Sequence, residues 1–147
     1  MLKDANAMAA MHKTYTGSCH CGAVRFECDI DLAGAGAGTS KCNCSVCTKS
    51  RFWKAIAKAG AFRLRQGQDA LTEYRFGSGG IQHFFCSRCG IKTFGRGHLD
   101  LLGGEFHAVN VACLDDLSPE ELARLPVRYE DGRHDDWGHV PAETTYL

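Results

Sequence analysis

The stretch CSRCG at residues 86–90 decides the fold, together with the stretch GSCHCG at residues 17–22. The first is a Cys-x-x-Cys-Gly knuckle, in which a tight turn directs two thiolates at one metal and the glycine lets the backbone curl beneath the sulfurs. The second adds a Cys-x-Cys pair. Four thiolates make the full ligand set of a closed, structural zinc site: Cys19, Cys21, Cys86 and Cys89. Such a site would tie the first strand to a middle strand and contribute directly to folding. A redox-active dithiol at the knuckle is the alternative.

A second cluster, CNCSVC at residues 42–47, has Cys-x-Cys-x-x-Cys spacing. Three thiolates in so short a segment predict one shared metal. Three protein ligands with a free fourth position are typical of a catalytic zinc, so we predict an open zinc site at Cys42, Cys44 and Cys47. A redox or sulfur-handling centre is one alternative. In another alternative, a histidine closes the site, and the candidates are His83, His98 and His107.

The ligand type of this second cluster predicts its substrate class. Three thiolates on a divalent cation leave a net negative charge, so the metal is a weak Lewis acid and ionises water poorly. Thiolates are soft ligands that zinc accepts readily, and coordination lowers the pKa of a thiol. We therefore expect a small thiol as the substrate, activated to react with an electrophile.

Length and composition indicate a single globular domain. The chain has 147 residues, 44% of them hydrophobic, with 17 basic and 17 acidic side chains. We expect a flexible lead-in at residues 1–14 and one zinc-binding domain at residues 15–147. Zero net charge argues against broad binding to nucleic acid, and no apolar stretch predicts a membrane helix or a signal peptide.

Cysteine usage points to a reducing compartment, and we predict a cytoplasmic protein. Nine cysteines are an odd number, so complete internal disulfide pairing is impossible. Cys28 and Cys113 lie alone in strand-like segments and are predicted to be buried apolar residues.

Hydrophobic periodicity predicts a mainly β protein of short antiparallel strands with glycine turns. The segment at residues 33–38, AGAGAG, is expected to be a loop. Ser118 to Glu121 is a capping box with Pro119 at the first helical position, which predicts one short C-terminal helix. Strands are expected at residues 24–30, 52–58, 62–65, 71–76, 81–85 and 106–112.

Polar residues after the second cluster could bind the substrate. Lys49, Arg51 and Lys54, with Phe52 and Trp53 beside them, would form a carboxylate-binding lip; a strand with one solvated face is the alternative. His107 and Asn110 could face the open zinc as proton shuttle or hydrogen-bond donor, and a structural role is the alternative.

At three cysteine motifs the sequence resembles the glutathione-dependent formaldehyde-activating enzyme family, which includes centromere protein V. The motifs are GSCHCGAVRF at residues 17–26, CNCSVC at 42–47 and FCSRCG at 85–90, with a weaker match, VNVACLD, at 109–115. The resemblance implies a β-tent fold, in which two small antiparallel sheets meet over zinc. It also implies two zinc ions per chain, at the two cysteine sets predicted above.

The activity implied by the resemblance is condensation of formaldehyde with glutathione to S-hydroxymethylglutathione, a carbon–sulfur lyase activity. This agrees with the thiol substrate argued from the ligand type. Two other functions remain: a non-catalytic glutathione carrier, and a two-zinc interaction module with both metals fully ligated.

Overall fold

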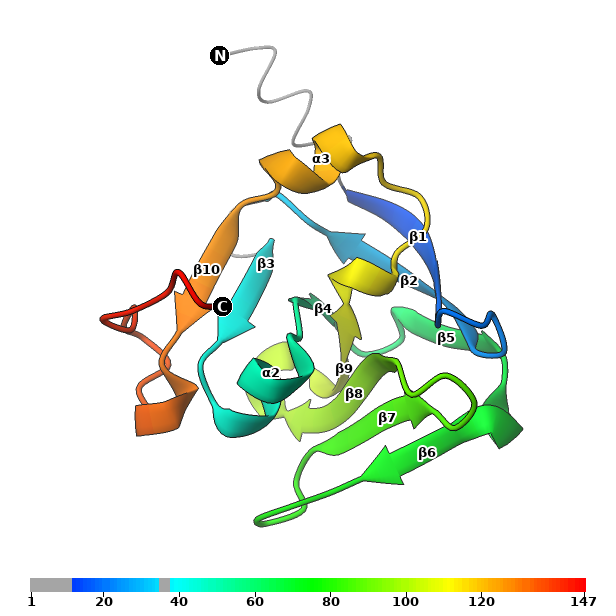
Figure 1. The fold of residues 1–147 in the computed structure, drawn as a ribbon, viewed down its shortest axis with the longest axis horizontal. Helices are drawn as coiled ribbons and strands as arrows, with labels where there is room; N and C mark the ends of the chain where they lie inside the picture. Colours follow the sequence, from blue (N-terminus) through cyan, green and yellow to red (C-terminus); the bar gives the residue numbers. More distant parts are fainter. Residues whose placement is uncertain (1–11, 35–37) are drawn as a thin grey trace.

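The computed structural model describes residues 12–34 and 38–147, and in this part of the chain the protein is mainly β (Figure 1). The strands are β1 (His12–Ser18), β2 (Arg25–Asp31), β3 (Thr39–Cys42), β4 (Lys54–Ala57), β5 (Phe62–Gln66), β6 (Leu71–Tyr74), β7 (Gln82–Cys86), β8 (Lys92–Leu99), β9 (Gly104–Asn110) and β10 (Val127–Glu130). The α-helices are α2 (Ser45–Ser50) and α3 (Pro119–Arg124), and four 3-10 turns are η1 (Gln68–Ala70), η2 (Asp100–Leu102), η3 (Val111–Cys113) and η4 (Gly132–His134). None of the described helices combines the length and apolar character needed to cross a membrane.

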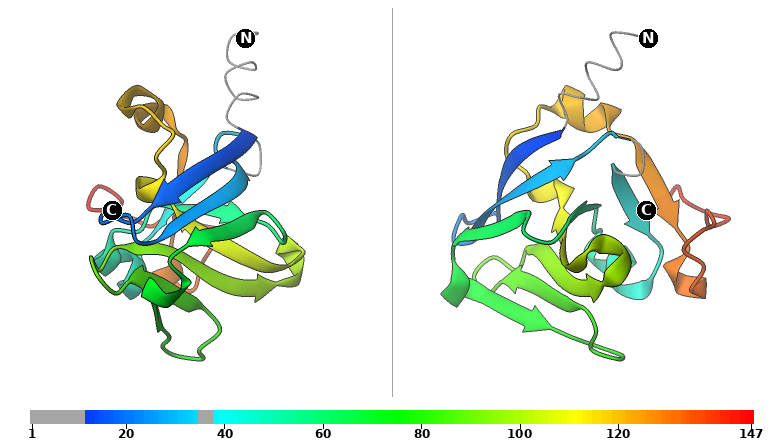
Figure 2. Two further views of the ribbon diagram at one scale, coloured as in Figure 1. Left: turned by 90° about the vertical axis from the view of Figure 1, so that its right-hand side faces the viewer. Right: turned by 180° about the vertical axis from the view of Figure 1, so that it is seen from behind.

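The strands form two sheets, as the predicted fold class requires. One has three strands in the order β1-β2-β5, and the other has seven in the order β10-β3-β4-β9-β8-β7-β6. Figure 2 shows the smaller sheet lying obliquely over one side of the larger one. The predicted fold class is thus confirmed; the second sheet is larger than expected, with seven strands, and its β10 pairs with β3 in parallel. Strand β10 follows α3 near the end of the chain, and it runs in the same direction as β3 when it joins the sheet beside that strand.

The hydrophobic core lies between the two sheets. In β2, Phe26, Cys28 and Ile30 are buried, as their alternation predicts. The Phe26 ring lies 5.5 Å from that of Phe62 in β5 and 6.1 Å from that of Phe94 in β8, measured between centroids. These aromatic contacts join the small sheet to the large one.

The two isolated cysteines are buried, as predicted. Cys28 is fully buried and Cys113 is 6% exposed. Burial raises the pKa of each thiol to about 12, so both stay protonated at neutral pH. They behave as small apolar side chains, and neither is suited to bind metal or act as a nucleophile.

Several predicted elements are present with shifted ends. The predicted strand at residues 106–112 stops at Asn110, because the Asn110 side chain accepts a hydrogen bond from the Ala112 N–H and caps the turn η3. Strand β1 begins at His12, inside the expected lead-in, while residues 1–11 lie outside the described part. The α3 capping box is confirmed, with Ser118 and Glu121 each bonded to the backbone of the other. A second helix, α2, was not predicted, because its six residues include two serines, a valine and a cysteine.

Candidate metal centres

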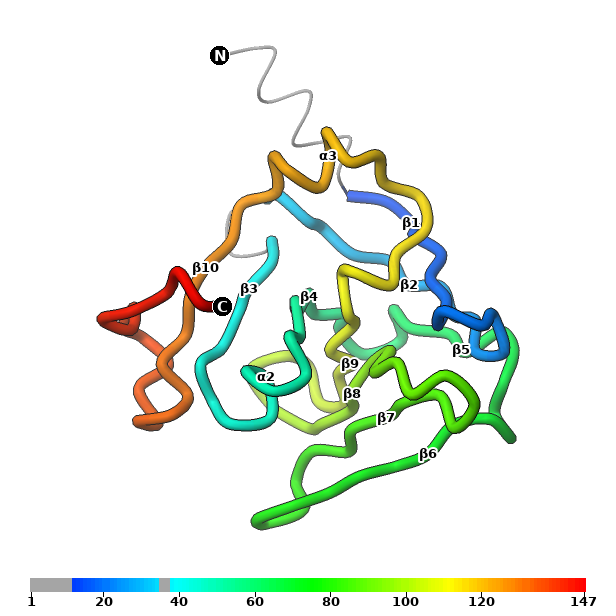
Figure 3. The backbone as a smooth tube through the Cα atoms, in the orientation of Figure 1, coloured from blue at the N-terminus to red at the C-terminus, as the bar shows by residue number. Residues whose placement is uncertain are grey.

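The four-cysteine cluster lies where two distant turns meet. Cys19 and Cys21 are in the turn after β1, whereas Cys86 ends β7 and Cys89 lies in the turn before β8. Figure 3 shows the blue β1–β2 turn beside the green β7–β8 turn. The Cys21 sulfur lies 3.6 Å from those of Cys19 and Cys86. Tetrahedral zinc with Zn–S bonds of about 2.3 Å separates its sulfurs by roughly 3.8 Å, so the arrangement suits a zinc ion.

Backbone N–H groups hold these sulfurs in place. The Val24 N–H donates to the Cys19 sulfur at 3.3 Å, and the Arg88 N–H donates to the Cys86 sulfur at 3.4 Å. A hydrogen bond from the Cys89 backbone N–H is the largest contribution that lowers the pKa of Cys86. Gly90, which follows the knuckle, has φ of +77°, a conformation that favours glycine. Donors aimed at sulfur stabilise the thiolate form that a metal needs.

The three-cysteine cluster is built around the start of α2. Cys42 ends β3, Cys44 is the N-cap residue of α2, and Cys47 lies in its first turn. The three sulfurs all lie within 4.8 Å of one another. Hydrogen bonds from the Cys42 and Cys47 thiols lower the pKa of Cys44 to about 2, and the hydrogen bonds of Cys47 with Cys42 and Cys44 raise the pKa of Cys47. One thiolate is thus stabilised by two protonated neighbours, and a bound cation would be needed to hold all three as thiolates.

This set contains no fourth protein ligand among the described residues. No histidine nitrogen or carboxylate oxygen there joins the three sulfurs within 4.8 Å. The His107 ring stacks on Phe62, with centroids 4.1 Å apart, and His98 is exposed. His83 Nδ1 faces the Lys92 ammonium at 2.9 Å. The geometry therefore favours three protein donors over a site closed by histidine.

The segment after β10 packs beside Cys42. Buried Asn43 donates to the Asp131 carboxylate at 2.8 Å and accepts from the Arg133 N–H at 2.9 Å. These bonds bring Gly132 against the cluster: a Cβ atom at Gly132 would lie 2.5 Å from the Cys42 sulfur. The position of the Cys42 sulfur thus depends on Gly132, which is remote from it in the sequence.

Gly132→Ala should weaken zinc binding at the three-cysteine cluster by roughly tenfold or more, a typical cost of disturbing the surroundings of a metal ligand. The added methyl would also lie 2.7 Å from the Trp137 ring; that ring is half exposed and has room to move, whereas Cys42 is buried, so its sulfur must be displaced. Metal analysis during chelator titration measures the effect. Gly138→Ala is the matched control, because a Cβ there meets nothing within 4 Å. Equal zinc retention by the two variants would contradict the prediction.

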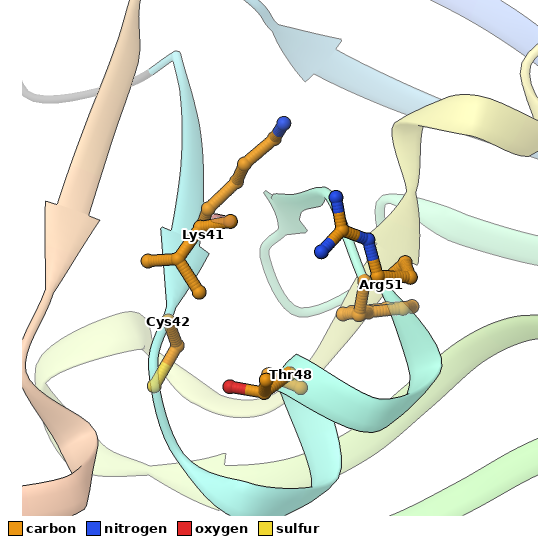
Figure 4. A pocket seen from close by; sticks show the side chains of 7 residues that line it. Lys41, Cys42, Thr48 and Arg51 are labelled. Atoms are coloured by element: carbon orange, nitrogen blue, oxygen red, sulfur yellow. The ribbon is translucent and has the colours of Figure 1, made fainter. Parts of the chain in front are cut away.

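A small pocket of about 30 Å³ lies directly beside the cluster (Figure 4). The Thr48 hydroxyl is buried and has no hydrogen-bond partner among the described residues, and Figure 4 shows it pointing toward the Cys42 side of the pocket. Arg51 has the left-handed backbone conformation, with φ of 56°, and its guanidinium donates to the Tyr146 carbonyl. The lining residues are Lys41, Cys42, Cys47, Thr48, Arg51 and Phe52, with Leu147.

The other predicted substrate residues are dispersed. Lys49 is exposed on α2 and borders a separate, wider groove of about 500 Å³ with the rings of Tyr74 and Phe76. Trp53 packs against the core, and the Lys41 ammonium lies 5.4 Å from its ring centroid. Of the predicted lip, Arg51 and Phe52 line the pocket beside the cysteines.

His107 and Asn110 have structural contacts. Burial lowers the pKa of His107, which stacks in the core against Phe62. Asn110 donates to the Lys92 carbonyl at 2.9 Å and caps η3. Neither lines the pocket beside the three cysteines.

Sequence reasoning missed Thr48 and Lys92 as residues near the site. Thr48 follows Cys47 directly, and this adjacency in the sequence could have suggested it. Lys92 is remote in sequence, and only the fold brings its ammonium to Phe52, which lines the pocket beside the cysteines. No local sequence signal distinguishes it from an ordinary strand lysine.

Comparison with known proteins agrees with this geometry. The sequence model of the family described as glutathione-dependent formaldehyde-activating enzyme matches residues 14–128, which contain both cysteine clusters. A crystal structure of a Rhodobacter sphaeroides protein, a structural genomics target, matches with a TM-score of 0.62 and 34% sequence identity. The match covers 77% of this chain and 99% of that one.

Proposed function

This chain belongs to the glutathione-dependent formaldehyde-activating enzyme family, and on that premise we propose that it acts on an adduct of a small thiol. The proposed reaction is condensation of glutathione with formaldehyde to S-hydroxymethylglutathione. It requires zinc at both clusters, one structural and one reactive. The observation that carries the proposal is the set of three converging thiols beside a pocket lined by Arg51.

Different residues of this chain would bind the metal, bind the substrate carboxylate and stabilise the developing negative charge. Cys42, Cys44 and Cys47 would hold the reactive zinc, which supplies a coordination position for the substrate thiol and lowers its pKa. Arg51, released from the Tyr146 carbonyl, would pair with a carboxylate of glutathione. The unpartnered Thr48 hydroxyl would donate a hydrogen bond to the oxygen of the aldehyde as negative charge develops on it.

The proposed step is balanced without an oxidant or a further co-reactant. The glutathione thiol loses its proton to solvent, and the sulfur then forms a bond to the carbonyl carbon of formaldehyde. The π electrons of the C=O bond move to oxygen, which takes up one proton. The net change is addition of S–H across C=O, and cleavage of the adduct is the reverse.

Exchange NMR on a mixture of glutathione and formaldehyde tests the proposal. The zinc-loaded protein should accelerate interconversion of free glutathione and the adduct, whereas an equal concentration of zinc salt should not. An unchanged rate excludes this reaction for the chain. Line broadening of glutathione alone, without acceleration, would indicate a carrier, and absence of any thiol binding would indicate an interaction module.

A further inference from the structure

One partly buried cation near the three-cysteine cluster has no carboxylate partner in the described part of the chain. Lys92, at the start of β8, forms none of the ion pairs found there. Its ammonium lies 4.2 Å from the ring centroid of Phe52, which lines the pocket beside the cysteines. Burial lowers the pKa of Lys92, and the charges of Cys47 and then Cys44 raise it. Because Phe52 lines the same pocket as Cys42 and Cys47, its contact with Lys92 places this cation close to the pocket beside the cluster.

The neighbours of Lys92 fix its position without neutralising it. His83 is 8% exposed, and its Nδ1 lies 2.9 Å from the Lys92 ammonium. Burial, followed by the charge of Lys92, lowers the pKa of His83 to about 4, so the ring is neutral and Nδ1 accepts the hydrogen bond. Lys54 also acts on Lys92, but Lys54 is itself paired with Glu130 at 2.7 Å.

The backbone of Lys92 is anchored as well. Its carbonyl accepts hydrogen bonds from the Asn110 amide, at 2.9 Å, and from the Cys113 thiol, at 3.7 Å. Phe85 is its partner in the ladder between β7 and β8. The backbone of Lys92 is thus fixed, and its ammonium is held by His83 and by the Phe52 ring. The ammonium therefore needs little rearrangement to stabilise negative charge in the cluster.

We propose that Lys92 is a fixed counter-charge that makes the three-cysteine centre select anionic thiolates over neutral ligands. Three thiolates and a divalent cation carry a net charge of −1, and a fourth thiolate brings this to −2. The Lys92 ammonium offsets that second charge, whereas a neutral ligand adds no charge to offset. The inference rests on the proposed function only in assuming that the cluster binds metal and a thiol.

Ligand titration of the cobalt(II)-substituted protein at one fixed pH tests the role of Lys92. The ligands are 2-mercaptoethanol, which has no carboxylate, and imidazole, which is neutral; the visible cobalt absorption bands report binding. Lys92→Gln, which can still bond His83, should weaken thiol binding roughly tenfold or more and leave imidazole binding nearly unchanged. Lys92→Arg should restore most of the thiol affinity. Lys58→Gln, a change at an exposed lysine after β4, is the matched control and should behave like the unaltered protein.

Two results would overturn the inference: unchanged thiol affinity in Lys92→Gln, or equal loss of thiol and imidazole binding, which would show a structural role. Two equivalents of cobalt and an unchanged circular dichroism spectrum establish that each variant is folded. The readout is a ratio of affinities, so it is independent of the reaction rate. Failure of the proposed enzyme activity would appear in the exchange NMR of the unaltered protein, without bearing on this ratio.

Discussion

Cys44→Ser should lose one of two bound zinc ions and reduce thiol–aldehyde exchange to the rate in free solution, while the fold is retained. Two cysteines remain at the cluster, and a neutral hydroxyl is a poor replacement for a thiolate ligand. The fold should survive because Cys44 is the N-cap residue of α2 and makes no side-chain capping bond. Serine is among the best N-cap residues, so the helix start should be at least as stable as before.

Zinc content, circular dichroism and exchange NMR measure this result together. Cys113→Ser is the matched control, because Cys113 is outside both clusters and its thiol donates to the Lys92 carbonyl, a bond that a hydroxyl can keep. The control should retain two zinc ions and full exchange. Unfolding of Cys44→Ser would show that the second metal is structural. Full activity in the variant would show that the reaction does not need this cluster.

Cys86→Ser should unfold the domain or lower its melting temperature far more than any ordinary point substitution. Cys86 is fully buried, and its cluster joins the turn after β1 to the turn between β7 and β8. Cys21 and Cys86 are 65 positions apart, so metal at this cluster closes a long loop. Zinc binding in small zinc domains contributes about 10–16 kcal/mol, which equals or exceeds the net stability of about 5–15 kcal/mol of most domains.

Thermal unfolding with and without a chelator measures the contribution of this site. The matched control is Cys28→Ala, a buried cysteine outside both clusters, which should cost only the few kcal/mol of a small core truncation. The chelator should destabilise the unaltered protein strongly and have no further effect on Cys86→Ser. An unaltered melting temperature in Cys86→Ser would contradict a structural metal at this cluster.

Local sequence was sufficient for elements whose stability is local. The α3 capping box and the β2 alternation could be predicted because a single turn or strand satisfies them within a few residues. The helix α2 could not, since six residues of modest helix propensity do not form a helix alone. The pairing of β10 with β3 was also invisible, because parallel partners far apart in the sequence leave no turn signal.

Sequence by itself determined the two groups of thiols, because cysteines two and three positions apart must converge in any tight turn, and it determined the family, because three such motifs occur in order. Only the tertiary structure decided what surrounds the second group. The hydrogen bond from Asn43 to Asp131 holds the segment after β10 against Cys42, with Gly132 at the point of contact. Strand β8 places Lys92 beside Phe52 and His83. Charge and desolvation act through space over a few ångströms, and the order of residues along a chain does not encode those distances until it folds.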